Sequence, residues 1–235
     1  MECPSEFQAP KVPRIREHEL SGDERQIATS VSANLTNLKR HYDEVASSFL
    51  LRAYMEPRHR EEREEIWNQR SRGEMTPSHD CVYFRWINLA FRSGGMAARD
   101  FVFALERLQS LPGRVASWCD GVDSKAIKAA RSDFDALFPG IERVRHTIAH
   151  PEVFANPEGG WRVSGKIPAP GLPGVTLVDA TGGSAQINMS IIGDHYLATH
   201  ETGAVSYELS EQTTQSLLEI TTQVFGAFEG ISVRR

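Results

Sequence analysis

The sequence IERVRHTIAH, residues 141–150, carries its apolar side chains at the spacing of a helix. Ile141, Val144 and Ile148 follow one another at intervals of three and four residues, which places them on one face of an α-helix. Pro151 comes directly afterwards and disfavours helical backbone in the residue before it. The stretch therefore predicts the C-terminal part of an amphipathic helix that packs against other apolar surfaces.

Three basic side chains, Arg145, His146 and His150, gather in the last two turns of this helix. His146 and His150 are four residues apart and share a face, and Arg145 lies about 100° around the helix from His146. An arginine fork matches the geometry of a phosphate, and a histidine exchanges a proton near neutral pH. These groups suit metal-independent cleavage of RNA, in which a 2′-hydroxyl attacks the adjacent phosphate. One helix supplies few such groups, so two copies would have to face each other across a two-fold axis.

Apolar stripes at helical spacing predict a helical bundle upstream of this stretch. Pro57 is expected to end the first long helix, and the charged segment 58–72 is expected to be a solvated helix. The triplet Ser93-Gly94-Gly95 is expected to interrupt or kink a later helix. Helices are expected at 24–56, 58–72, 79–92, 96–110, 122–137 and 210–228.

The composition changes after residue 150, where Gly, Pro, Thr and Val become frequent. Turn dipeptides separate short apolar runs, which predicts a small antiparallel β element. The expected fold class is mainly α, a helical bundle with a small antiparallel β insertion before a C-terminal helix that packs back on the bundle. The strand candidates are 160–166, 174–179, 185–192, 195–199 and 204–209. The expected organisation is an extended N-terminal arm at 1–20, one domain at 21–228 with the insertion at about 151–209, and a tail at 229–235.

The overall composition excludes several classes of protein. The net charge of −5 gives no support to nonspecific DNA coating, because proteins of that class are usually strongly basic. The three cysteines, Cys3, Cys81 and Cys119, are far apart and form no CxxC pair, so neither a zinc knuckle nor a disulfide framework is expected. The polar N-terminus and the lack of a long apolar run predict no signal peptide and no membrane contact. A cytoplasmic protein with reduced thiols is expected.

The segment Arg145-His146-Thr147-Ile148-Ala149-His150 resembles the motif of the HEPN superfamily of α-helical proteins. That motif is an arginine, commonly followed by a polar residue, and then a histidine after four to six residues. The resemblance extends loosely over residues 79–228, where a short β segment and a closing helix follow the motif. It implies a bundle that dimerises with a ribonuclease site between the two motif helices. It also implies that Arg145 and His150 are the catalytic pair, that His146 assists, and that RNA is the substrate.

Two other interpretations of the Arg145–His146–His150 cluster remain open. Basic side chains near a helix C-terminus interact favourably with the helix dipole and can cap its free carbonyls, as in a non-catalytic interaction or ligand-binding protein. A histidine pair four residues apart can also hold zinc, with a third ligand from Glu152, His195, His200 or Glu201. The leading expectation is a homodimeric endoribonuclease of a defence or toxin type that needs no cofactor and no metal.

Overall fold

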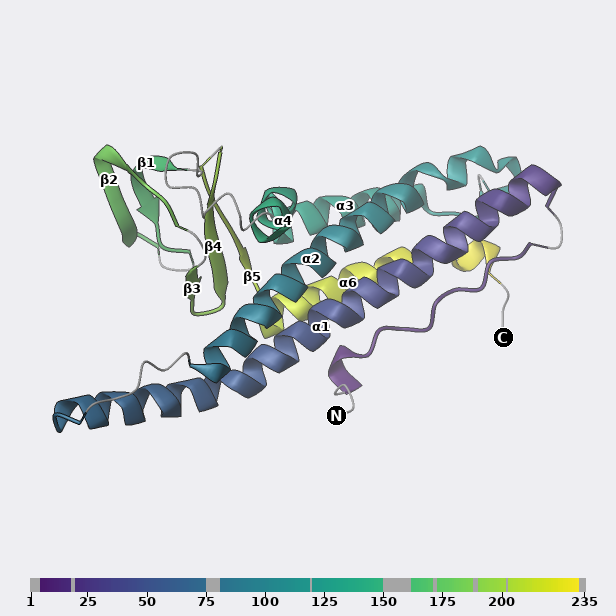
Figure 1. The fold of residues 1–235 in the computed structure, drawn as a ribbon. Coiled ribbons are helices and arrows are strands. Elements are labelled where there is room, and N and C mark those ends of the chain that lie inside the picture. Colours follow the sequence, from purple (N-terminus) through teal and green to yellow (C-terminus); the bar gives the residue numbers. More distant parts are fainter. Residues whose placement is uncertain are drawn as a thin grey trace.

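The computed structural model describes residues 5–17, 20–74, 81–118, 120–149, 162–170, 173–187, 190–201 and 203–232. Two long antiparallel helices, α1 (Gly22–Ser71) and α2 (Val82–Ser110), form the spine of the molecule (Figure 1). Two further helices, α3 (Ser124–Leu137) and α6 (Glu211–Gly226), contact each other and complete the bundle. The short α4 (Ile141–Ala149) lies between this bundle and the strands. This arrangement confirms the expected mainly α fold class with a β insertion before the C-terminal helix.

Helix α1 is longer than its sequence predicts. It begins at a capping box, in which the Ser21 backbone N–H donates to the Glu24 carboxylate over 3.0 Å. The expected end at Pro57 is wrong, because the helix continues through Pro57 to Ser71. Pro57 lies at an exposed position, where water can satisfy the carbonyl that loses its N–H donor. The charged segment 58–71 is helical and largely exposed, as expected, and it projects beyond the bundle (Figure 1).

Helix α2 runs without a break through Gly94 and Gly95, so the expected interruption there is wrong. A Cβ atom on Gly95 would lie 2.9 Å from Cδ1 of Ile148 and 3.1 Å from Cε1 of Tyr207. The two glycines are therefore required by close packing rather than by a bend. Gly95 lets α4 and strand β5 approach the backbone of α2, and Gly94 makes room for Ser48 of α1 and for Leu209.

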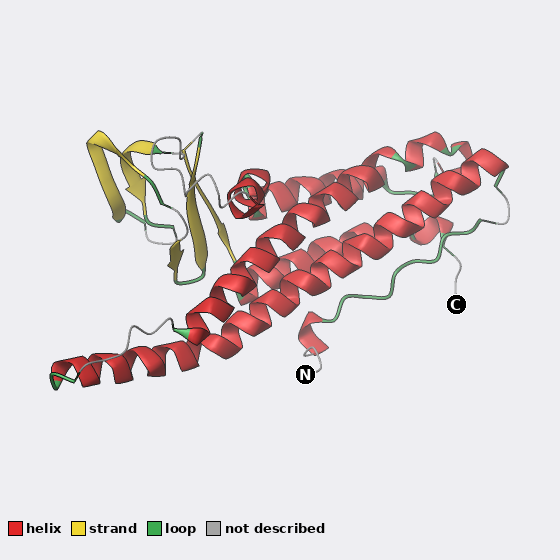
Figure 2. Ribbon diagram, viewed as in Figure 1, coloured by secondary structure: helices red, strands yellow, loops and turns green. Residues whose placement is uncertain are grey.

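The insertion forms two small antiparallel sheets (Figure 2). One sheet pairs β1 with β2, and the other has the order β3-β4-β5. A separate apolar cluster of Val163, Ile167, Ile187 and Leu197 fills the space between strands of both sheets. The expected β element is thus confirmed, with strands β1 Val163–Pro168, β2 Thr176–Ala185, β3 Ser190–Ile192, β4 His195–His200 and β5 Gly203–Glu208.

Polar contacts attach the β3-β4-β5 sheet to the helices. The buried Arg52 guanidinium, on α1, donates to the backbone carbonyl of Leu209 and to the carboxylate of Asp194 in the β3–β4 turn. The Tyr207 hydroxyl, on β5, donates to the backbone carbonyl of Phe91 on α2. These bonds fix the sheet beside α4 instead of leaving it as an independent lobe.

The two ends of the described chain meet on the bundle. Two residues of the N-terminal arm contact the rest of the chain. The Phe7 carbonyl accepts a hydrogen bond of 2.9 Å from the Tyr42 hydroxyl on α1, and Ile15 forms an isolated β-bridge with Ser232. The arm therefore lies along α1 instead of projecting into solvent. Short 3-10 turns stand at η1 Ser5–Phe7, η2 Pro112–Arg114, η3 Ala116–Trp118 and η4 Glu229–Ile231. Among the described helices, none has a stretch long and apolar enough to cross a lipid bilayer.

Candidate functional site

Helix α4 has the amphipathic character that its sequence predicts. Ile141, Val144 and Ile148 are all buried, each less than one tenth exposed. Thr147 is also buried, and its hydroxyl donates to the Val144 carbonyl over 2.7 Å and lies 3.1 Å from the Tyr196 hydroxyl on β4. These contacts fix the rotation of α4 about its axis. His146 consequently faces outward, and Arg145 is half-buried against the bundle.

The strand insertion brings a second imidazole to α4. Nε2 of His200, the last residue of β4, lies 3.4 Å from Nδ1 of His146, and the two ring centroids are 5.6 Å apart. His200 is buried and His146 is exposed. Burial lowers the pKa of His200 below its ordinary value. The charge of Glu201 opposes this shift, and the charges of His146 and Arg143 add to it. His200 is therefore suited to remain neutral beside His146.

Arg145 stands next to another arginine. Its Nε atom is buried and has no hydrogen-bond partner among the described residues. Burial lowers the pKa of Arg99, on α2, and the charge of Arg145 lowers it further, against the opposing effects of Asp100 and Glu142. The Arg99 guanidinium is already bonded to Asp100 over 3.0 Å and lies over the ring of Phe103. Arg145 thus has a buried donor without a partner among the described residues, in a locally positive setting.

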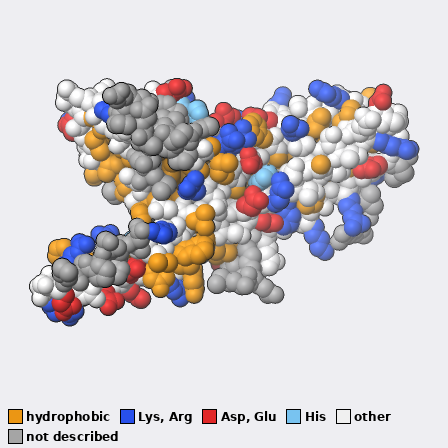
Figure 3. All heavy atoms as spheres, viewed as in Figure 1, with side chains coloured by type: hydrophobic (Ala, Val, Ile, Leu, Met, Phe, Trp, Pro, Cys, Tyr) orange, Lys and Arg blue, Asp and Glu red, His pale blue; other side chains and the backbone are white. Residues whose placement is uncertain are grey.

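Acidic side chains accompany these bases on the surface. On the face drawn in Figure 3, Lys and Arg side chains alternate with Asp and Glu where the sheet meets the helices. The surface there is of mixed charge and not continuously positive, in agreement with the net charge of −5.

His150 and Glu152, which the sequence singled out as a catalytic residue and as a zinc ligand, lie outside the described residues. Of the remaining zinc ligands considered, His195 begins β4 and His200 ends it. Five residues of extended strand separate their backbones by about 17 Å. Of these two, His200 is the one whose imidazole reaches His146, so a zinc site that uses His200 as its third ligand stays a prediction.

One free carbonyl at the end of α4 is bonded by a base from another helix. The C-terminal carbonyl of Ile148 accepts a bond of 3.4 Å from the Arg92 guanidinium, which comes from α2. A base from another helix thus serves the end of α4, and Arg145 has no such bond at its Nε. The structure brings Arg145, His146 and His200 to one region, and His200, which the sequence offered only as one of four possible zinc ligands, comes from β4.

Comparison of the chain with protein families, characterised proteins and solved structures finds no match.

A groove of about 710 Å³ lies away from α4, between the far half of α1, the start of α2 and the β3–β4 turn. Cavity shape alone would favour this groove as the functional site, whereas the positions of the candidate acid–base groups favour the surface at α4. At α4, His146 contacts His200 of β4, and the neighbouring Arg145 has a buried Nε without a hydrogen-bond partner among the described residues. Side chains that line the groove include Arg52, His59, Arg63, Trp67, Phe84 and Ile191.

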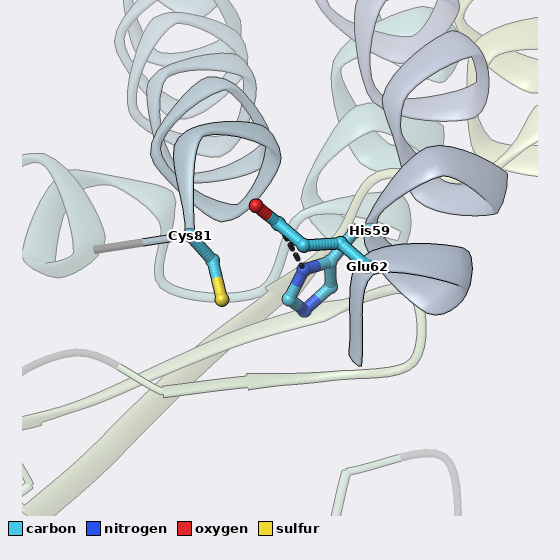
Figure 4. A group of neighbouring side chains, drawn as sticks. All are labelled: His59, Glu62 and Cys81. Carbon is cyan, nitrogen blue, oxygen red and sulfur yellow. Dashed lines mark ion pairs between the residues drawn. The ribbon is translucent and has the colours of Figure 1, made fainter. Parts of the chain in front are cut away.

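Beside this groove, His59, Glu62 and Cys81 form a group that could hold a metal ion (Figure 4). One ligand atom from each lies within 4.8 Å of the others. Burial lowers the pKa of His59, with Arg63 adding to the effect, and burial with the nearby Glu62 charge raises the pKa of Cys81. Sequence reasoning missed the group, because segment 58–72 was interpreted as a solvated helix and Cys81 belongs to no recognised metal motif.

Proposed function

We propose that this protein is a metal-independent endoribonuclease of HEPN type that acts as a homodimer. The observation that carries the proposal is the buried, unpartnered Nε of Arg145 beside the His146–His200 pair. A buried guanidinium donor without a partner is costly, and a phosphate oxygen would satisfy it. The HEPN-like motif supplies His150 as the second member of the catalytic pair.

The proposed chemistry divides between the arginine and the histidines. The 2′-hydroxyl loses its proton to a neutral imidazole and attacks the adjacent phosphorus, while Arg145 binds the non-bridging oxygens. The P–O5′ bond breaks, and the leaving oxygen takes a proton from an imidazolium. His150 is the proposed acid–base residue, and His146 assists with His200 behind it. The products are a 2′,3′-cyclic phosphate and a 5′-hydroxyl.

The homodimer follows from the number of groups that this reaction needs. One protomer supplies one His150 and one Arg145, whereas the reaction needs a base, an acid and charge stabilisation together. A two-fold axis that brings two α4 helices together would supply two of each. The dimer thus completes the site in this proposal, and a monomer is expected to be inactive.

The direct test is cleavage of RNA in EDTA by the wild type and by three variants. Arg145→Ala and His150→Ala should each lower the rate by about 100-fold or more, because each removes a positioned donor or proton carrier. Arg107→Ala is the control, because it removes an exposed arginine of another helix, α2. This variant should cleave RNA like the wild type. Equal, negligible cleavage by all four proteins would contradict the proposal.

One observation favours a second candidate function, a non-catalytic interaction protein. Hydrophobic side chains gather near the point where α1 and α2 leave the bundle (Figure 3). Val82, Trp86 and Leu89 recur on one face of α2 and are 44–56% exposed. This face would bind a second copy of the chain. Loss of self-association in Trp86→Glu, measured by sedimentation equilibrium, together with no ribonuclease activity, would support this alternative.

A further inference from the structure

His59, Glu62 and Cys81 lie outside the region that the ribonuclease proposal uses. His59 and Glu62 are three residues apart on one face of α1, and Cys81 is the residue before α2 begins. Figure 4 shows the three side chains facing the same small space from these two helices. The ring of Phe84 packs on the His59 imidazole, with 5.3 Å between centroids, and thereby holds its orientation.

A second His–Glu pair on α1 provides an internal comparison. His41 and Glu44 have the same spacing, and their Nδ1 and Oε2 atoms close to a hydrogen bond of 2.9 Å. In the His59–Glu62 pair the corresponding atoms stay 3.9 Å apart. Both of these atoms are buried, and apart from this long ion pair neither has a hydrogen-bond partner among the described residues. Buried polar atoms are rarely left without a partner, so this pair calls for something between its members.

A transition-metal ion would fit between them. Imidazole nitrogen, thiolate sulfur and carboxylate oxygen are the donors that Zn²⁺ takes, at about 2.0–2.3 Å and in tetrahedral geometry. Such bonds place the ligand atoms about 3.3–3.8 Å from one another. The observed separations, 3.9 Å for His59–Glu62 and at most 4.8 Å within the group, approach these values. Mg²⁺ and Ca²⁺ are poorer matches, because they prefer oxygen ligands throughout.

We propose that His59, Glu62 and Cys81 form a zinc site that joins α1 to the start of α2. Three protein ligands leave a fourth position for water, and His59 lines the neighbouring groove of about 710 Å³. The ion links the segment of α1 that projects beyond the bundle to the first turn of α2. This inference does not rest on the ribonuclease proposal, because its residues and its test are separate.

The test titrates Zn²⁺ into the full-length, chelator-stripped protein against a chromogenic competitor. We expect one ion per chain, and with Co²⁺ as a substitute we expect a thiolate-to-metal charge-transfer band. Cys81→Ser should remove that band, and His59→Gln should weaken Zn²⁺ binding by more than about 100-fold. His41→Gln and Cys3→Ser are the matched controls and should bind like the wild type. The proposal would be overturned if the wild type bound no stoichiometric Zn²⁺. It would also be overturned if Cys81→Ser and His59→Gln both bound Zn²⁺ as tightly as the wild type.

A second measurement needs no variant and is therefore independent of variant folding. Iodoacetamide alkylation of the three cysteines of the wild type is followed by peptide mass spectrometry, with and without Zn²⁺. The ion should slow alkylation of Cys81, because a coordinated thiolate is a poorer nucleophile, and leave the rates of Cys3 and Cys119 unchanged. Equal rates at Cys81 in both conditions would contradict the zinc site.

Discussion

Nε2 of His200, at the end of β4, lies 3.4 Å from Nδ1 of His146, on α4. This contact joins residues 54 positions apart and makes the β insertion part of the candidate site. The insertion is positioned by Arg52, Tyr196 and Tyr207, which bond it to α1, α4 and α2. The strands therefore have a role beside the helix motif, because they hold a buried imidazole behind an exposed one.

The lowered pKa of His200 predicts a pH-dependent stability. The folded protein resists protonation of this imidazole, whereas the unfolded chain protonates it near the ordinary value of 6.5. The buried, neutral His200 imidazole therefore leaves the free energy of unfolding at its full value above pH 6.5. That free energy decreases as the pH falls from 6.5 toward the lower pKa of His200 in the folded protein. His200→Gln should reduce the loss of unfolding free energy between about pH 7.5 and pH 5.5, measured by urea denaturation. An unchanged pH dependence in this variant would show that His200 titrates normally.

Arg52 is predicted to be the main anchor of the sheet. Arg52→Met leaves the Leu209 carbonyl and the Asp194 carboxylate without their donor. Because Asp194 is 46% exposed, we expect a loss of about 2–3 kcal/mol, below the full cost of a deeply buried ion pair. Arg40→Met is the matched control. Arg52 also pairs with Glu56 over 2.9 Å, and Arg40 pairs likewise with Glu44, four residues later on α1, but is 60% exposed. It should cost less than about 0.5 kcal/mol. Similar losses for both variants would refute the anchor.

Gly95 is predicted to be required for the approach of α4 and β5 to α2. In Gly95→Ala the new methyl group meets Ile148 and Tyr207, both buried. Overpacking costs about 1–3 kcal/mol and outweighs the gain of about 0.5–1 kcal/mol that alanine brings to a helix interior. The net result should be a loss of about 1 kcal/mol in thermal or urea unfolding. Gly226→Ala, at an exposed helical position with nothing within 4 Å, should be neutral or stabilising, and a loss there as well would argue against packing as the cause.

Much of the fold could be predicted from the sequence, because apolar periodicity determines where helices and strands form. The stripe of Ile141, Val144 and Ile148 was enough to predict α4 and its buried face. The predicted helix end at Pro57 was wrong, because Pro57 lies at an exposed position of α1 where the helix can continue. The predicted interruption at Gly95 was wrong, because tertiary packing, and not a bend, requires a glycine there.

The composition of the two candidate sites was harder to predict. Arg145 and His146 are neighbours in sequence, and their placement on α4 follows from helical geometry alone. His200 joins them only through the register of β4 and the bonds that attach the sheet to the helices. Cys81 reaches His59 and Glu62 only because α1 continues past Pro57, which the local sequence does not predict.

The central claim is that the Arg145–His146–His150 motif cleaves RNA through the 2′-hydroxyl without a metal. The most direct measurement compares single-turnover cleavage, in EDTA, of an RNA and of the same strand with 2′-deoxy sugars, by wild type and by Arg145→Ala. The account predicts that only wild type cleaves, that only the RNA is cut, and that the products end in a 2′,3′-cyclic phosphate. Cleavage of the deoxy strand, or no cleavage of any RNA by the wild type, would contradict it.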